Sequence, residues 1–268
     1  MATEDDAFMS GNFASRTMQT AALTGRCALV TGASRGIGAE IARRLAQSGA
    51  TVVVNYPDET ESAHAKQTIA SIEESGGRAF AFTADVSDPQ QIHALFQQSI
   101  AVCGGIDILV LNAGGDAVIR PVLETTEAEF DRVMTLNARG QFVALQLAAR
   151  HLRNGGRIIF ISSSTASQPY PGTASYAGAK IASEAYVRTL ARQVAKRGIT
   201  ANVVSPGMTA TEKMLSQTTE ARRATVIAAT PLGRIATTAD IADVVHFVAT
   251  DAARLLNGQV VHVNGGLL

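Results

Sequence analysis

The sequence predicts a single α/β domain in which helices cover both faces of a doubly wound parallel sheet of about seven strands. Short runs of β-branched residues alternate with longer stretches of helical period, and such alternation indicates βαβ crossovers. Runs such as IDILVL at 106–111 and RIIFI at 157–161 are almost entirely apolar, as expected for strands that are covered on both faces. A glycine-rich turn also follows the first strand.

The expected elements follow one another with few interruptions. We expect strands, from their β-branched and apolar runs, near 27–31, 51–55, 79–83, 106–111, 157–162, 199–204 and 259–263. We expect helices, from the 3.6-residue period of their apolar positions, near 36–48, 60–75, 88–102, 126–150, 175–197 and 238–250.

Two segments stand outside this alternation. Residues 1–24 have no sustained period, so we interpret them as a loosely ordered extension ahead of a dinucleotide-binding and catalytic domain over 25–268. The segment 207–230 directly follows the carboxyl end of a strand, where open α/β sheets bind ligands, and it is the candidate lid. An ordinary helical insertion on the surface is the alternative.

Composition excludes several classes of protein. The 268 residues are 46% hydrophobic and 17% charged, with 23 basic and 23 acidic side chains. A neutral chain offers no broad field for nucleic acid or membrane lipid, and no apolar run approaches the roughly 18 residues of a membrane-spanning helix. The acidic start lacks a secretory signal, which favours the cytoplasm. Two isolated cysteines and five scattered histidines predict neither a structural disulfide nor a metal site.

The turn from Thr31 to Gly38, reading TGASRGIG, predicts a phosphate-binding loop. Gly32 permits the turn, Gly36 lets backbone amides approach a pyrophosphate, and Gly38 permits close packing of helix on strand. A plain strand-to-helix turn is the alternative. No Gly-Lys-Ser/Thr follows, which disfavours nucleoside triphosphate hydrolysis.

The end of the second strand bears on the choice of dinucleotide. An Asp or Glu there would meet a free ribose 2′-hydroxyl, whereas a 2′-phosphate prefers an arginine. The strand ends Asn55-Tyr56 and Arg35 lies in the adjacent loop, so we expect NADPH rather than NADH. If Asp58 or Glu59 folded back, that preference would weaken.

Tyr176 and Lys180 lie four residues apart on one expected helix, so they share a face. A tyrosine can donate a proton to a carbonyl oxygen if its pKa of about 10 falls toward neutrality. A lysine charge about 5 Å away, at an effective dielectric near 20, contributes about 3 kcal/mol, or roughly two pKa units. On spacing alone, packing plus a surface charge is the alternative.

Four motifs together resemble the short-chain dehydrogenase/reductase family, whose members have a Rossmann-type fold. They are Thr31–Gly38, Asn112-Ala113-Gly114, Ser163 thirteen residues before Tyr176, and Tyr176 with Lys180. The similarity runs from Gly25 to Gly266. The residues around Asn55-Tyr56 and at 136–142 resemble those of polyketide-type and hydroxynaphthalene reductases and of acyl-carrier ketoreductases. Asn257-Gly258 and Asn264-Gly265-Gly266 depart from the family's common Thr-Gly and Asp-Gly-Gly.

The resemblance implies a role for each matching residue. Tyr176 would be the proton donor, Lys180 would lower its pKa and bond the nicotinamide ribose, Ser163 would hold the substrate oxygen, and Asn137 would position a water. Ser163 stands between two other serines and could instead cap a turn, and Asn137 could be satisfied within its helix. The implied cofactor contacts are Gly32, Ser34, Arg35, Gly36, Ile37, Gly38, Asn55, Tyr56, Asp85, Val86, Asn112, Ala113, Gly114, Tyr176, Lys180, Pro206, Gly207 and Thr209. Asn112 could instead brace the sheet, and Asp85 could cap a helix.

The function expected from these residues is NADPH-dependent reduction of a ketone to a secondary alcohol. An NAD-dependent alcohol dehydrogenase and a non-catalytic dinucleotide-binding regulator are the alternatives. Candidate substrate walls are Asp116, Val118, Thr165, Tyr170, Met208 and Met214, which suit a medium-sized, partly hydrophobic ketone. Helices 126–150 and 175–197 carry apolar residues around much of their circumference, including Val143, Ala144, Leu147, Ala148, Ile181, Ala185 and Leu190. With the family's usual pairing of these helices, this predicts a homotetramer.

Overall fold

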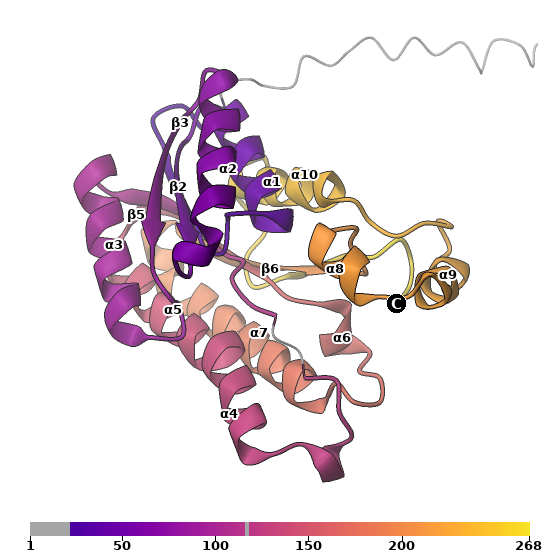
Figure 1. Ribbon diagram of the computed structural model, residues 1–268. Coiled ribbons are helices and arrows are strands. Elements are labelled where there is room, and N and C mark those ends of the chain that lie inside the picture. Colours follow the sequence, from indigo (N-terminus) through magenta and orange to yellow (C-terminus); the bar gives the residue numbers. More distant parts are fainter. Residues whose placement is uncertain (1–21, 116–117) are drawn as a thin grey trace, which may run out of the picture.

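The computed structural model describes residues 22–115 and 118–268, in which seven strands form one parallel sheet (Figure 1). The strands are β1 Cys27–Val30, β2 Thr51–Tyr56, β3 Arg78–Thr83, β4 Ile106–Leu111, β5 Leu152–Ile161, β6 Thr200–Pro206 and β7 Val260–Val263. They are ordered β3-β2-β1-β4-β5-β6-β7, and every neighbouring pair is parallel. The predicted fold class and all seven predicted strands are confirmed.

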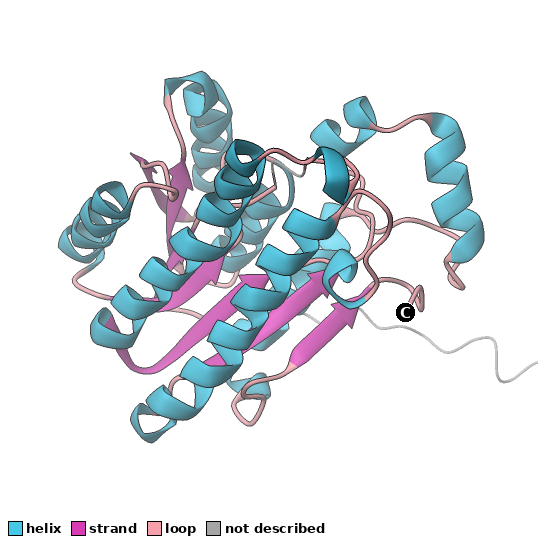
Figure 2. Cartoon of the chain, turned by 90° about the horizontal axis from the view of Figure 1, so that it is seen from below, coloured by secondary structure: helices cyan, strands magenta, loops and turns pink. Residues whose placement is uncertain are grey.

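Helices cover both faces of this sheet (Figures 1 and 2). One layer consists of α1 Gly36–Gln47, α2 Ser62–Glu74 and α10 Thr238–Ala249, and the other of α3 Pro89–Cys103, α5 Gly140–His151 and α7 Ala174–Val194. The shorter helices are α4 Glu127–Met134, α6 Ser164–Ser167, α8 Glu212–Gln217 and α9 Glu220–Ala229. Strands β1 and β4 are buried at every residue, which explains why their sequences are apolar without alternation.

Local sequence signals explain several helix ends. The Asp88 side chain accepts a hydrogen bond from the Gln90 amide at the start of α3, and Pro89 takes the first helical position, where no donor is needed. Gly104 ends the same helix at φ 69°, in the left-handed region that favours glycine. Thr237 and Asp240 form a reciprocal capping box at the start of α10.

The structure differs from the sequence prediction in the helix expected at 126–150. It is divided into α4, a π-helical turn over Thr135–Arg139, and α5. A Cβ at Gly140 would lie 2.1 Å from the Val86 carbonyl oxygen, so close contact with the loop after β3 requires glycine at this position. Periodicity does not reveal this turn, because a single wide turn hardly disturbs the apolar spacing.

The predicted boundary of the extension lies partly outside the described residues, since 1–21 are not described. Leu23 is 1% exposed and packs in the core with Ala50 and Val52, so the folded domain already includes this residue. The predicted lid segment contains α8 and α9, neither of which has a fully buried residue. No helix in the described part of the chain is both long and apolar enough to cross a bilayer.

The strand order reverses between β1 and β4. From β1 the order continues through β2 and β3 to one edge of the sheet, and from β4 it continues through β5 and β6 to β7 at the other edge. Loops that leave two such strands diverge, one to each face, and leave a crevice at their carboxyl ends. The protein therefore has its main candidate site at this edge.

Candidate active site

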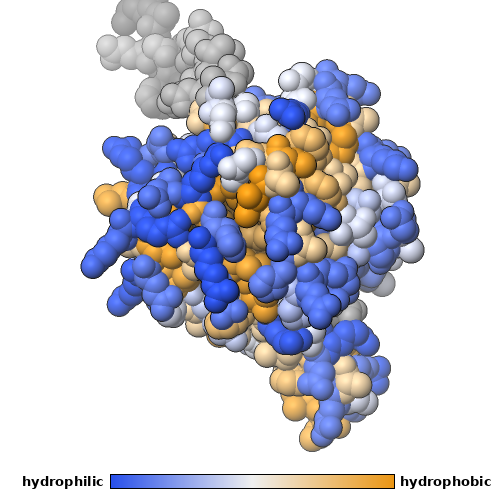
Figure 3. Space-filling model, turned by 90° about the vertical axis from the view of Figure 1, so that its left-hand side faces the viewer, coloured by the Kyte–Doolittle hydropathy of each residue, from blue (hydrophilic) through white to orange (hydrophobic). Residues whose placement is uncertain are grey.

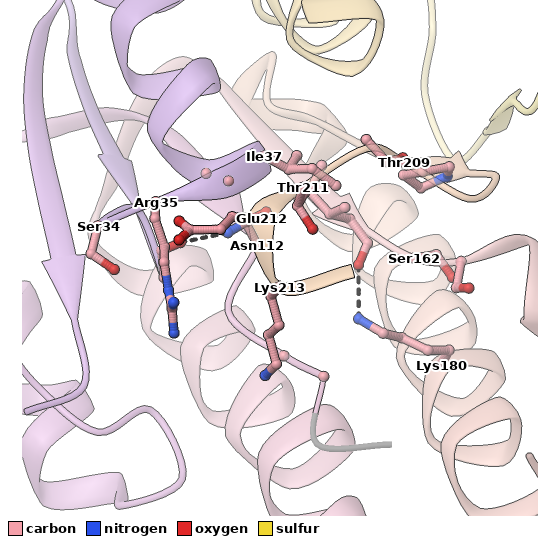
Figure 4. Close-up of a pocket in the computed structure, with 18 of the residues that line it drawn as sticks. Ser34, Arg35, Ile37, Asn112, Ser162, Lys180, Thr209, Thr211, Glu212 and Lys213 are labelled. Carbon is pink, nitrogen blue, oxygen red and sulfur yellow. Dashed lines mark hydrogen bonds between the residues drawn. The ribbon is translucent and has the colours of Figure 1, made fainter. Parts of the chain in front are cut away.

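A cleft of about 390 Å³ lies at the carboxyl edge of the sheet (Figure 4). It is lined by the loops after β1, β2, β4, β5 and β6, by one face of α7 and by the start of α8. Of the predicted site residues, it brings together Gly32, Ser34, Arg35, Gly36, Ile37, Gly38, Asn112, Gly114, Ser163, Tyr176, Lys180, Pro206, Gly207 and Thr209. Asn55, Tyr56, Asp85, Val86, Ala113 and Asn137 do not line it.

The glycine-rich loop forms one end of the cleft as the sequence predicts. Gly32 and Gly36 both have φ of 61°, and α1 begins at Gly36 with its first amides facing the cleft. A Cβ on Gly38 would lie 2.3 Å from the Gly32 carbonyl oxygen and 2.4 Å from Asn112 Nδ2. The loop can therefore pack on the sheet and expose backbone donors to an anion, which fits a dinucleotide pyrophosphate.

We expect Gly38→Ala to lower the free energy of unfolding by about 1–3 kcal/mol, because backbone and amide atoms must move to admit the methyl group. Gly178→Ala is the matched control, since a Cβ there meets nothing within 4 Å and alanine favours a helix interior. Urea denaturation of both variants measures the effect. Equal stability of the two would contradict the close packing at Gly38.

Two asparagines hold the loop in place from neighbouring strands. Asn112 Nδ2 donates to the carbonyl oxygens of Thr31 and Gly32, at 2.9 and 2.8 Å. Asn55 is 1% exposed; its Oδ1 accepts from the Gly32 amide and its Nδ2 donates to the Ala84 carbonyl oxygen. Asn112 therefore braces the sheet and also lines the cleft, whereas the structure gives Asn55 a purely structural position.

The polar end of the cleft holds Ser34, Arg35 and a residue that the sequence argument missed. Glu61 accepts a hydrogen bond from Ser34 Oγ at 2.9 Å and pairs with Arg35 Nη2 at 2.6 Å. Asp58 is one of the two acids that would weaken the NADPH preference by folding back toward the cofactor. It instead caps the turn before α2, and its hydrogen bonds from Thr60 lower its pKa. Glu59 is exposed and lies outside the cleft.

Three of the cofactor contacts implied by the resemblance, Tyr56, Asp85 and Val86, do not line the cleft. Tyr56 is half-buried and packs against the core beside α1 and α2. The Asp85 carboxylate accepts a hydrogen bond from the Ser87 amide at 2.8 Å and so caps a turn, whereas Asp88 supplies the helix cap that was the alternative for Asp85. Val86 is buried with its carbonyl oxygen against Gly140. The cofactor roles of these three residues remain predictions.

Tyr176 and Ser163 meet in the middle of the cleft. Tyr176 is half-buried, and loss of water around its hydroxyl raises its pKa to about 12, while a hydrogen bond from Ser163 acts in the opposite direction. Ser163 also caps α6, because its Oγ accepts from the Thr165 amide at 3.2 Å. Ser162 lines the cleft too, but its hydroxyl donates to Glu184 at 2.5 Å, so the middle serine is the one available to a ligand.

Lys180 corrects the electrostatic prediction. Its side chain is buried, its Nζ donates to the Ile161 carbonyl oxygen at 2.9 Å, and burial lowers its pKa to about 8 (Figure 4). The net shift of the Tyr176 pKa is upward, because desolvation of the phenol is the largest influence, and Lys180 is not among the groups that shift it. The predicted proximity is nevertheless present, since Nζ lies 5.7 Å from the centre of the Tyr176 ring.

Asn137 lies in the π-helical turn, just outside the cleft, and is fully buried. Its side-chain amide donates to and accepts from the backbone of Gly115, with both distances 2.9 Å. Its backbone carbonyl oxygen accepts from Ser183 Oγ at 2.8 Å. These contacts show that Asn137 holds the loop after β4 against α7, and its role in water positioning remains a prediction.

The segment 207–230, the predicted lid, contributes three cleft residues that were not predicted from the sequence. Thr211, Glu212 and Lys213 line the cleft from the start of α8, and a Cβ at Gly36 would be 3.4 Å from Thr211. Figure 4 shows Lys213 reaching into the cleft opposite Lys180. Among the predicted substrate-wall residues, Val118, Thr165, Tyr170, Met208 and Met214 do not line the cleft. Asp116 lies outside the described residues.

Comparison with known proteins gives consistent similarities. A family model described as enoyl-(acyl carrier protein) reductase matches residues 32–268. The chain is 42% identical over 256 residues to a versicolorin reductase of Emericella nidulans, which covers 91% of this chain and 96% of that protein.

Solved structures show the same architecture. A short-chain dehydrogenase of Burkholderia cenocepacia, in complex with NADP, has a TM-score of 0.86 and 37% identity over 92% of this chain and 99% of that one. An angucycline C-6 ketoreductase with bound NADP has a TM-score of 0.87 and 38% identity over 92% of this chain and 97% of the other. The chain is therefore similar in both sequence and fold to dinucleotide-dependent reductases.

Proposed function

The chain belongs to the short-chain dehydrogenase/reductase family of oxidoreductases, and we propose that it reduces a ketone to a secondary alcohol with NADPH. One observation carries the proposal: Ser163, Tyr176 and Lys180 line the same cleft as the glycine-rich loop. A phosphate-binding loop alone would suit any dinucleotide-binding protein. The hydroxyl pair and the buried lysine add the groups needed to polarise and protonate a carbonyl oxygen.

The residues of the cleft fit a dinucleotide along its length. Backbone amides at the start of α1 would bind the pyrophosphate, Arg35 and Ser34 would lie at the adenosine ribose, and Lys180 would lie at the nicotinamide ribose. Gly114 lets the loop after β4 lie close to Lys180 and Asn137, because a Cβ there would lie 2.9 Å from Asn137 Oδ1 and 3.1 Å from Lys180 Nζ. The bound cofactor supplies the hydride.

The chain's own residues handle the substrate oxygen and its proton. Ser163 Oγ orients the ketone oxygen by a hydrogen bond, and Tyr176 donates the phenolic proton as negative charge develops on that oxygen. A Tyr176 pKa of about 12 suits donation, since the phenol stays protonated across the neutral range. Lys180, held by the Ile161 carbonyl oxygen, places a positive charge behind the phenol.

The test is oxidation of NADPH, followed by absorbance at the nicotinamide band, with a panel of ketones. We propose a fused-ring polyketide ketone as the substrate class, because relatives include a versicolorin reductase, hydroxynaphthalene reductase-like proteins and an angucycline C-6 ketoreductase. Turnover of such ketones supports the proposal. Cofactor binding without turnover of any ketone or alcohol would favour the non-catalytic regulator instead.

We also propose that the protein is a homotetramer that pairs α5 and α7 with their symmetry mates. Four of the residues named from the sequence are buried within the chain and cannot face a partner: Ala144, Leu147, Ala148 and Leu190. Two others of the named residues, Ile181 and Ala185, are exposed, and Phe142 of α5 is exposed with them; Ile181 is 48% and Phe142 45% exposed. They lie on outer faces that a second copy would cover. Figure 3 shows apolar side chains gathered between polar ones on the side of the molecule that lies at the left in Figure 1.

We expect light scattering to give a mass near four times the 28.0 kDa chain. Ile181→Glu should lower that mass, because a charge on a paired helix face must be desolvated. Leu123→Glu, at a residue that is fully exposed, is the control and should leave the mass unchanged. A monomeric wild-type protein at micromolar concentration would contradict the tetramer.

A further inference from the structure

The polar end of the cleft contains an anion site that the chain fills with its own carboxylate. Ser34 Oγ donates to one oxygen of Glu61 at 2.9 Å, and Arg35 Nη2 pairs with the other at 2.6 Å. Both donors line the cleft, and Glu61 lines it with them. Each carboxylate oxygen therefore engages one of the two side chains that a ribose 2′-phosphate would need.

The position of Glu61 is built into the fold. The Ser34 side chain is buried, and its carbonyl oxygen accepts a hydrogen bond from Thr68 Oγ1 of α2 at 2.8 Å. Because Glu61 directly precedes α2, this bond holds the backbone around Glu61 next to the phosphate loop. The Glu61 side chain is only 16% exposed, whereas Arg35 is 44% exposed and keeps a free path to solvent.

We propose that Glu61 sets cofactor selectivity by competing with the 2′-phosphate for Ser34 and Arg35. A 2′-phosphate must displace the carboxylate and then lie near its negative charge, whereas a 2′-hydroxyl can donate a hydrogen bond to it. Glu61 thus weakens NADPH binding and supports NADH binding. The preference of the wild-type enzyme for NADPH over NADH is consequently smaller than Arg35 would produce without Glu61. This inference rests on the proposed function, because it assumes that a dinucleotide occupies the cleft.

Displacement of Glu61 remains feasible because partly exposed ion pairs are weak. Arg35 can turn from the carboxylate to a phosphate without leaving its loop, since both ligands would approach the same cleft edge. A doubly charged phosphate also attracts the guanidinium more strongly than a carboxylate does. We therefore expect the protein to bind both NADPH and NADH, and we expect the Glu61 side chain to set the ratio of the two affinities.

The experiment measures equilibrium dissociation constants of NADPH and NADH by fluorescence titration for wild type and Glu61→Gln. The variant keeps the size of the side chain but removes its charge. We expect the dissociation constant for NADPH to fall about tenfold and that for NADH to stay equal or rise. Glu59→Gln is the control, because it removes the same charge from an exposed residue of the same turn.

Two further measurements locate the effect. Adenosine 2′,5′-bisphosphate should bind more tightly to Glu61→Gln, whereas adenosine 5′-monophosphate, which lacks the 2′-phosphate, should bind with unchanged affinity. On an Arg35→Ala background, the effect of Glu61→Gln on NADPH should shrink, since the two residues act on one anion.

The outcomes separate this inference from the function it rests on. Unchanged or weaker NADPH binding in Glu61→Gln, with normal binding by wild type, would overturn the role of Glu61 and leave the reductase proposal standing. Failure of the wild-type protein to bind either dinucleotide would overturn the proposed function itself. If Glu59→Gln also bound NADPH about tenfold more tightly, the effect would come from the net charge of the region and not from the contacts of Glu61 with Ser34 and Arg35.

Discussion

Tyr176→Phe is expected to lower kcat at least about 100-fold while changing the dissociation constant of the cofactor by less than about twofold. The substitution removes one hydroxyl, and general acid catalysis by a positioned side chain contributes about 100- to 10,000-fold to rate. The ring and its packing remain, so the fold and the cofactor end of the cleft keep their shape. Steady-state kinetics and fluorescence titration measure the two quantities separately.

Tyr186→Phe is the matched control for this prediction. Tyr186 lies on the same helix, and its ring packs edge-on against Phe142, 5.1 Å between centroids, outside the cleft. It should retain close to wild-type kcat. Residual activity of Tyr176→Phe above about one percent of wild type would remove Tyr176 from the role of proton donor.

Lys180→Met is expected to lower kcat/KM by about 100- to 1,000-fold, the usual cost of removing one preorganised electrostatic group. Methionine keeps the length of the side chain but removes the charge beside Tyr176 and the hydrogen bond to the Ile161 carbonyl oxygen. Lys196→Met, at an exposed lysine beyond the end of α7, is the control and should match wild type. Activity above one tenth of wild type in Lys180→Met would contradict the assignment.

Lys180 also predicts opposite pH trends for activity and stability. Burial lowers its pKa from 10.5 to about 8 in the folded chain. If the ammonium form is required, wild-type kcat/KM should fall as the pH rises through about 8. Between pH 8 and 10.5 the unfolded chain holds the proton that the folded chain has lost. The contribution of Lys180 to the free energy of unfolding therefore rises over that range, by about 3 kcal/mol.

The difference between wild type and Lys180→Met isolates both trends, because other titrating groups are common to the two proteins. Below pH 8 both states of wild type keep the proton, so the stability difference should be flat there. Urea denaturation and kcat/KM at pH 7 to 10 provide the measurements. A stability difference that does not change between pH 8 and 10 would show that Lys180 is not buried as the structure places it.

Much of the fold could be predicted because its signals are local. The apolar runs of β1, β4 and β5 and the spacing Gly32, Gly36, Gly38 depend only on neighbouring residues and on burial within one sheet. The π-helical turn at 135–139 could not be predicted, since the packing of Gly140 on the Val86 backbone joins positions 54 residues apart in the sequence.

In the candidate site too, the features that depend on nearby residues could be predicted, and those that depend on distant segments could not. The four-residue spacing of Tyr176 and Lys180 placed them on one helix face, and the motif around Gly36 predicted which end of the cleft would bind phosphate. Asn55 lies near the end of β2 as predicted, and its side-chain oxygen accepts from the Gly32 amide; its role in cofactor binding remains a prediction.

The sequence by itself determined the parallel α/β sheet, the dinucleotide loop and the identity of Ser163, Tyr176 and Lys180 as a set. Only the tertiary structure decided the electrostatics of these groups. Desolvation moves the pKa of Tyr176 up and that of Lys180 down, and it depends on every segment that packs around them. Likewise, only the fold of α2 against the phosphate loop selected Glu61, rather than Asp58 or Glu59, as the acid beside Arg35. Spacing along a chain fixes which residues are neighbours on one element, whereas charge and solvation depend on neighbours from all of them.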